Sequence, residues 1–175
     1  EVHGESHYRW VHDKVQEAAM SLVSEERMQQ FQLDIGEILL LQLSETELGA
    51  AIFVVANLLN AKEVSDPVKR TKIAELNLDA AKKAKALSAS ESAAKYGGKG
   101  IGLLAPDRWT SQKDLSLKIY SICAEAHYSL GNFTEMQKYC DEVLHQGDIP
   151  ILDKMKVYHC MIVAMGNGGR SPEGL

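Results

Sequence analysis

A glycine-rich stretch from Tyr96 to Gly102, YGGKGIG, is the first candidate for chemistry. A phosphate-binding loop needs backbone N–H groups around the phosphate, a lysine, and then a Ser or Thr that holds Mg²⁺. Here Lys99 is followed by Gly100, and the preceding segment LSASESAAKY has a helical pattern. We therefore favour a packed helix with small residues at close contacts. Because an interior glycine costs about 1 kcal/mol relative to alanine, we expect this helix to fray or bend at Gly97-Gly98.

The pair His12-Asp13 is the second candidate. A histidine at a helix start could donate a hydrogen bond to a phosphate, and the following aspartate could cap the helix. Taken alone, the pair is better explained as an N-terminal cap.

The other reactive side chains follow no catalytic or metal-binding motif. No histidine lies in an HExxH motif, and no serine lies in a nucleophile elbow. The three cysteines, Cys123, Cys140 and Cys160, form no CxxC pair, which indicates reduced, packed thiols in an intracellular, cytoplasmic protein. We predict no catalytic residue, no metal site and no enzymatic activity for this segment.

Composition narrows the class of protein. The 175 residues carry a net charge of −5, which disfavours nucleic-acid and anionic-membrane binding. The lysine-rich stretch from Lys62 to Lys99 has few aromatics, so we interpret it as a solvated helix face. No apolar run approaches the ~20 residues that cross a bilayer, and no signal peptide opens the chain. The chain begins with Glu1 and reads as an excerpt of a longer protein.

Apolar periodicity predicts eight helices. Three start signals support them: a small N-cap at Ser24, a capping box from Ser44 to Glu47, and the pair Asp66-Pro67. A fourth signal, a capping box, covers Ser88 to Glu91. In the second helix the predicted apolar face comprises Met28, Phe31, Ile35, Ile38 and Leu39. The predicted ranges are about 12–23, 24–43, 44–60, 66–87, 88–105, 112–130, 133–146 and 152–165.

The segment from Leu117 to Leu144 resembles a tetratricopeptide-type helical hairpin around a Gly-Asn-Phe turn. Such a hairpin cannot bury its apolar faces alone and must stack on neighbours. The helix before the turn has two apolar faces, one with Ile119 and Ile122 and one with Tyr120 and Ala124, as expected between two layers.

Turn positions at Ser88, Gly131 and Gly169 give spacings of 131 − 88 = 43 and 169 − 131 = 38 residues. These spacings exceed the usual ~34 of a tetratricopeptide, so the repeat is degenerate. The predicted fold is all-α, with irregular tetratricopeptide-like hairpins stacked as a short solenoid.

The order of segments resembles the region after the ATPase core in STAND-class signalling ATPases. The likeness is to AAA-containing hybrid histidine kinases and serine/threonine kinases, and it covers roughly residues 8 to 165. The quoted segments are YRWVHDKVQEAAMSLV, ERMQQFQLDIGEILL, FVVANLLN, IAELNLDAAKKAKALSAS and DLSLKIYSICAEAHYSLGNFTEM.

The resemblance implies three parts: the end of a winged-helix-like element at 1–23, helical linker hairpins at 24–105, and tetratricopeptide-like repeats at 106–175, the last incomplete. It also implies that His12, with Asp13, senses a bound nucleotide. ATP or ADP and Mg²⁺ would then bind an upstream domain, and this segment would hold no cofactor. The chain departs from the pattern at Phe31, where relatives often have histidine, in the stretch from Gly97 to Gly102, and in the tail from Gly166.

The resulting expectation is a non-catalytic regulatory scaffold that couples a nucleotide switch to a protein partner or to other domains of its own chain. Tyr120, Ala124, His127 and Tyr128 are the candidate partner-binding residues, although packing between repeats explains them as well. The alternative function is a free-standing peptide-binding adaptor; a weaker one makes residues 1 to 23 part of a nucleic-acid-binding winged helix. We expect the isolated segment to expose apolar edges, particularly around Val157 to Met165, and to self-associate.

Overall fold

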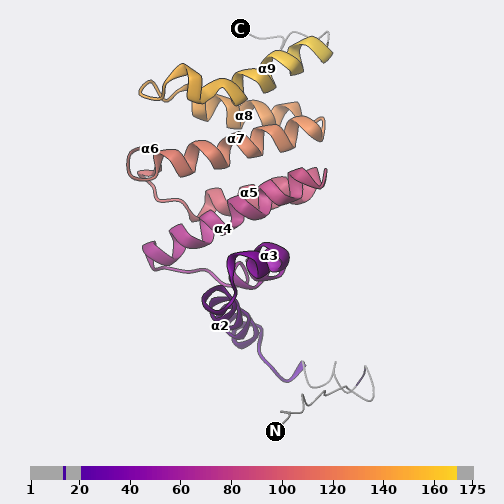
Figure 1. Cartoon of the computed structure of the whole chain (residues 1–175), viewed down its shortest axis with the longest axis vertical. Helices are drawn as coiled ribbons and strands as arrows, with labels where there is room; N and C mark the ends of the chain where they lie inside the picture. The colour runs from indigo at the N-terminus through magenta and orange to yellow at the C-terminus, as the bar shows by residue number, and fades with distance from the viewer. Residues whose placement is uncertain (1–13, 15–20, 169–175) are drawn as a thin grey trace.

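The computed structural model describes residue 14 and residues 21–168, and every regular element within these residues is helical. Figure 1 shows the helices following one another along the long axis of the molecule, from α2 near one end to α9 near the other. The all-α prediction is therefore confirmed. The elements are α2 (Glu25–Gln42), α3 (Glu45–Leu59), α4 (Pro67–Ala86), α5 (Ser90–Leu103), α6 (Arg108–Ser111), α7 (Lys113–Ser129), α8 (Phe133–Leu144), the 3₁₀ turn η1 (Ile151–Lys154) and α9 (Met155–Gly168).

Local capping chemistry sets three helix starts as predicted. The Ser24 side chain accepts from the backbone N–H of Arg27 at the start of α2. At α3 the capping box is complete, because Ser44 and Glu47 satisfy each other's backbone N–H groups. Asp66 caps α4 directly before a proline at the first helical position.

The capping box predicted at Ser88 is wrong. Ser88 has a left-handed φ of +58° and ends α4, while Ala89 precedes α5 without a side-chain cap. The backbone N–H of Ala89 bonds back to the carbonyl of Ala84, five residues earlier, which is a Schellman-type C-terminus. Ser88 therefore forms the C-terminal turn of α4, and its side chain does not cap α5.

The α7–α8 turn has the same construction. Gly131 has a φ of +70°, and the N–H of Asn132 bonds back to the carbonyl of His127, again five residues earlier. Ser88 and Gly131 thus occupy equivalent turn positions, as their spacing of 131 − 88 = 43 residues predicted.

The helices after these two turns also pack alike. Positions 43 residues apart point into the molecule in both α5 and α8, for example Ala93 with Met136 and Gly100 with Val143. Gly97 and Cys140 form a third buried pair, since 140 − 97 = 43. The α4–α5 and α7–α8 hairpins therefore share a turn and a burial pattern.

Helix α7 lies between two layers, and its two predicted apolar faces are both buried. Ile119 and Ile122 are buried on one, Tyr120 and Ala124 on the other. The helix contacts α5 before it and α8 after it, with further contacts to α4 and α9. A helix covered on both sides needs two apolar stripes, which is the pattern its sequence carries.

Helix α5 packs against α7 through glycine. A Cβ atom at Gly97 would lie 2.5 Å from Cys123 Sγ, and one at Gly100 would lie 3.2 Å from Ile119 Cδ1. The helix is continuous through Gly97-Gly98, so the expected fraying is not observed. Close approach of the two helices offsets the low helix propensity of glycine.

The apolar face predicted for α2 is partly wrong. Phe31 and Ile38 are 60% and 51% exposed, whereas Leu33 and Gly36 are buried. A Cβ atom at Gly36 would lie 3.0 Å from the Leu59 side chain, so α3 approaches α2 along the glycine. The face of α2 that packs against α3 is therefore the one with Leu33 and Gly36, and Phe31 and Ile38 lie outside it.

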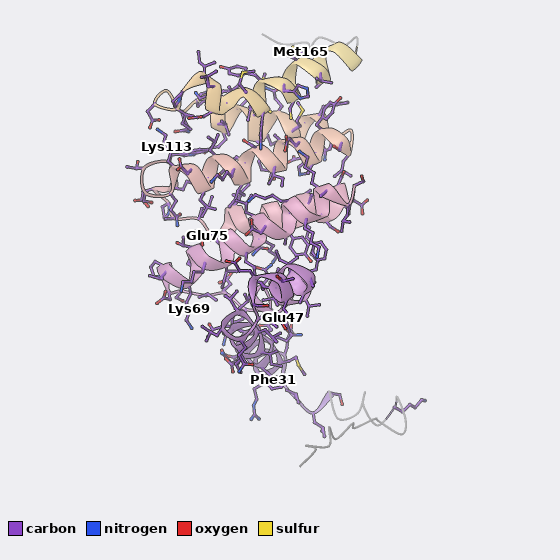
Figure 2. All side chains as sticks on the ribbon, in the orientation of Figure 1. Phe31, Glu47, Lys69, Glu75, Lys113 and Met165 are labelled. Atoms are coloured by element: carbon purple, nitrogen blue, oxygen red, sulfur yellow. The ribbon has the colours of Figure 1, made fainter. Side chains whose placement is uncertain are left out.

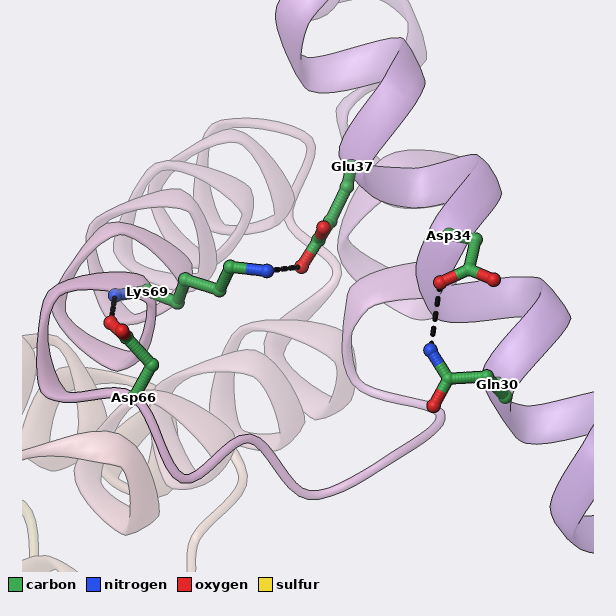
Figure 3. A network of polar contacts seen from close by, with 5 residues as sticks. All are labelled: Gln30, Asp34, Glu37, Asp66 and Lys69. Atoms are coloured by element: carbon green, nitrogen blue, oxygen red, sulfur yellow. Dashed lines mark hydrogen bonds and ion pairs between the residues drawn. The ribbon is translucent and has the colours of Figure 1, made fainter.

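Several lysines of the basic stretch are bound within the protein rather than free. Figure 3 shows Lys69 of α4 reaching Glu37 of α2, with Nζ and Oε1 2.6 Å apart. Lys85 pairs with Glu125 of α7 at 2.6 Å, and Lys83 donates to the carbonyl of Gly49 in α3. These contacts connect α4 to α2, α7 and α3. Some lysines of the basic stretch therefore have a structural role.

Candidate functional site

The glycine-rich stretch forms no phosphate-binding loop. Tyr96 to Gly102 lies inside α5, where the backbone N–H groups are committed to the helix. Tyr96 is buried, donates to the Asn57 side chain at 3.2 Å, and stacks on Phe53. The stretch therefore serves the packing of α5, as the packed-helix interpretation predicts.

The four predicted partner-binding residues lie on α7 beside α8. Tyr120 is buried between Trp109 and Tyr139, with ring centroids 5.2 and 6.1 Å away, and Ala124 is fully buried. Tyr128 is half-buried, with its ring 6.2 Å from that of Phe133. Packing between helices accounts for these positions, and the role of the four residues in partner binding stays a prediction.

His127 is half-buried in the same cluster and differs from the others in its polar atom. Its ring stacks on Tyr139 with centroids 5.3 Å apart and planes 28° apart. Its Nδ1 is buried and, among the described residues, has no hydrogen-bond partner. The ring therefore contributes stacking at the cost of one unsatisfied nitrogen.

The other candidate reactive residues form no site among the described residues. His12 and Asp13 lie outside the described residues. Within the described part of the chain, no group of three His, Cys, Asp or Glu residues could hold a metal ion. Burial raises the pKa of the Cys123 and Cys140 thiols to about 12, so both stay protonated and poorly nucleophilic near neutral pH.

A groove of about 380 Å³ runs between α4 and α7. Figure 2 labels Glu75 on α4 and Lys113 at the start of α7, the two helices that border the groove. Its volume lies within the ~300–1,000 Å³ of typical ligand sites. The groove is lined by Glu75, Leu78, Asp79, Lys82, Asp114, Leu115 and Lys118.

Two contacts fix the register of the helices that border the groove. Gln112 Nε2, just before α7, donates to Thr71 Oγ1 in the first turns of α4 at 2.7 Å. Further along both helices, Lys85 Nζ lies 2.6 Å from Glu125 Oε2. The partners differ by 112 − 71 = 41 and 125 − 85 = 40 residues, so α4 and α7 run parallel with nearly constant register.

This register separates charge along the groove. Asp114 lies at the beginning of α7 and at about the level of Glu75, near the middle of α4, and Lys82 lies toward the end of α4. By the same register, Leu115 lies at about the level of Glu75 and Lys118 at about the level of Leu78, which is itself only 4% exposed. Asp79 is already paired with Lys82 at 2.8 Å, which leaves the acidic end to Glu75 and Asp114.

The sequence carries only a weak signal for this site. Glu75, Leu78, Asp79 and Lys82 follow helical spacing, so they form one stripe on α4. The stripe is mostly charged, and a charged stripe usually faces solvent. Only the neighbouring α7 stripe turns it into one wall of a groove.

Comparison with protein-family models, with curated proteins and with solved structures finds no match to this chain. Among the described residues, no helix combines the length and the apolar character that crossing a bilayer requires.

Proposed function

We propose that this chain is a non-catalytic helical scaffold that holds a peptide segment of a protein partner in the α4–α7 groove. The observation that carries the proposal is the parallel placement of α4 and α7, the first helices of two hairpins with the same turn and burial pattern. We take the two hairpins as the start of a short solenoid, because equivalent helices of a solenoid line a continuous binding surface.

The setting that we propose for the scaffold is a multidomain signal-transduction ATPase or kinase. Its support is the resemblance of the segment order to the region after the core of STAND-class ATPases. In that setting the scaffold couples an upstream nucleotide switch, with His12 as sensor, to partner binding in the cytoplasm.

A free-standing adaptor that binds peptides is the second candidate. It is favoured by the position of the groove, which is built entirely from α4 and α7 and needs no other domain. The sequence encoded upstream of Glu1 separates the two settings. A GxxxxGK[ST] loop after a predicted strand supports the ATPase setting, and a complete gene without one contradicts it.

The scaffold function is tested by selecting binders from a random peptide library on the immobilised chain. Selected peptides are then titrated into ¹⁵N-labelled chain, and amide shifts are mapped by NMR. We expect the largest shifts in α4 and α7, around Leu78 and Leu115. If no selected peptide binds, or if the shifts cluster away from these helices, the proposal is wrong.

ATP hydrolysis by the same purified chain provides the test of its non-catalytic character. We expect no turnover above buffer and no tight binding of ATP or ADP. Hydrolysis that persists through successive purification steps would contradict the proposal.

A further inference from the structure

The charges of the α4–α7 groove are open at both ends. Glu75, Asp114 and Lys118 are exposed, and within the described part of the chain none of them makes a hydrogen bond or an ion pair. Lys82 is exposed as well and shares its charge with Asp79 only. Glu75, Asp114 and Lys118 can therefore meet a ligand without first breaking an internal contact, whereas Lys82 is shared with Asp79.

The distance between the charges sets the length of the ligand. Glu75 and Lys82 are seven residues apart on α4, which corresponds to about 10 Å along the helix axis. An extended chain advances about 3.3 Å per residue and places residues i, i+2 and i+4 on one side. The step from residue i to residue i+4 therefore covers about 13 Å. Flexible side chains at these two positions can reach charges that lie about 10 Å apart.

We propose that the groove selects an extended peptide segment with a basic side chain at one end and an acidic side chain at the other. The basic side chain pairs with Glu75 and Asp114. The acidic side chain meets Lys118 and Lys82, which lie further along α7 and α4. This inference rests on the proposed scaffold function and names the chemistry of its partner.

Three capped heptapeptides of one length test the selectivity. The mixed peptide is acetyl-Gly-Arg-Ser-Leu-Ser-Glu-Gly-amide; the di-acidic peptide has Glu in place of Arg, and the di-basic one has Arg in place of Glu. Fluorescence anisotropy of labelled peptides at low salt gives each Kd. We expect the mixed peptide to bind at least about fivefold tighter than either other, since one mismatched end loses a pair of exposed charge contacts.

Charge reversal in the groove should change the preferred peptide. The double variant Glu75→Lys/Asp114→Lys should prefer the di-acidic peptide, and Lys82→Glu/Lys118→Glu should prefer the di-basic one. All four side chains are exposed, so circular dichroism and thermal unfolding should match the unchanged protein. The control Glu63→Lys/Asp153→Lys makes the same charge change at exposed positions outside the groove and should leave the preference unchanged.

Equal binding of the three peptides, no binding of the mixed peptide at millimolar concentration, or an unchanged preference in both groove variants would overturn the inference. Failure of the scaffold function is distinguishable from these results. If library-selected peptides bind α4 and α7 but ignore the charge reversals, the scaffold function stands and the charge selectivity is wrong.

Discussion

At the scale of single residues, the aromatic cluster around Tyr139 contains one unfavourable atom. His127 and Tyr120 both pack their rings against Tyr139, and Trp109 donates its Nε1–H to Glu142 at 2.9 Å. The exception is Nδ1 of His127, which is buried without a partner. An unsatisfied buried polar atom costs roughly 1–3 kcal/mol, while ring stacking contributes about 0.5–1.5 kcal/mol.

Replacing this imidazole should therefore increase stability. We expect His127→Phe to raise the free energy of unfolding by about 1 kcal/mol, because phenylalanine keeps the stack and removes the buried nitrogen. Chemical denaturation at neutral pH measures the change. The matched variant His159→Phe alters an exposed histidine of α9 and should stay within about 0.5 kcal/mol. A clear loss of stability in His127→Phe would mean that the nitrogen is hydrogen-bonded to water in solution.

At the scale of elements, the contact between α5 and α7 depends on which glycine faces which neighbour. Gly97 and Gly98 are adjacent in one helix and have the same intrinsic helix propensity. A Cβ atom at Gly97 would meet Cys123 Sγ at 2.5 Å, whereas one at Gly98 would meet nothing within 4 Å. Substitutions at Gly98 thus report helix propensity alone, whereas substitutions at Gly97 also report packing against α7.

Alanine at these two positions should have opposite effects. Gly98→Ala should stabilise the protein by up to about 1 kcal/mol through helix propensity. Gly97→Ala should destabilise it by about 1–3 kcal/mol through overpacking against α7. Denaturation midpoints compare the two variants. Adding Cys123→Ala to Gly97→Ala should recover part of the loss, and a double variant no more stable than the sum of its parts would argue against this contact.

At the scale of the whole molecule, stability is divided among neighbouring helices. Contacts join mainly elements that follow one another in the chain, such as α2 with α3, α4 with α5 and α7 with α8. Helix α2 buries only Leu33 and Gly36, whereas α4 and α7 each bury many more side chains. In such an arrangement, local opening near one end need not open the rest.

Hydrogen exchange should reveal this division. We expect Leu33→Ala to speed amide exchange in α2 and α3, while α7 and α8 keep the protection of the unchanged protein. Val143→Ala, which removes a fully buried side chain of α8, should do the converse. Mass-spectrometric exchange on both variants gives protection helix by helix. Equal acceleration throughout the molecule in either variant would show a single cooperative unit instead.

How much was predictable depends on the range of the interactions. The starts of α2, α3 and α4 were predicted because Ser24, Ser44 and Asp66 act on backbone groups within three residues. The double-faced α7 followed from its own periodicity. Ser88 was misassigned because two local roles, ending α4 and capping α5, compete for one residue.

The sequence by itself determined the all-α class, most helix boundaries and the turn at Gly131, since these depend on residues a few positions apart. Only the tertiary structure decided which face of α2 is covered and which glycines carry the contact between α5 and α7. It also decided that the charged stripe of α4 meets that of α7 to form a groove. Each of these depends on surfaces brought together from distant parts of the chain, and their fit is not encoded in the periodicity of either helix alone.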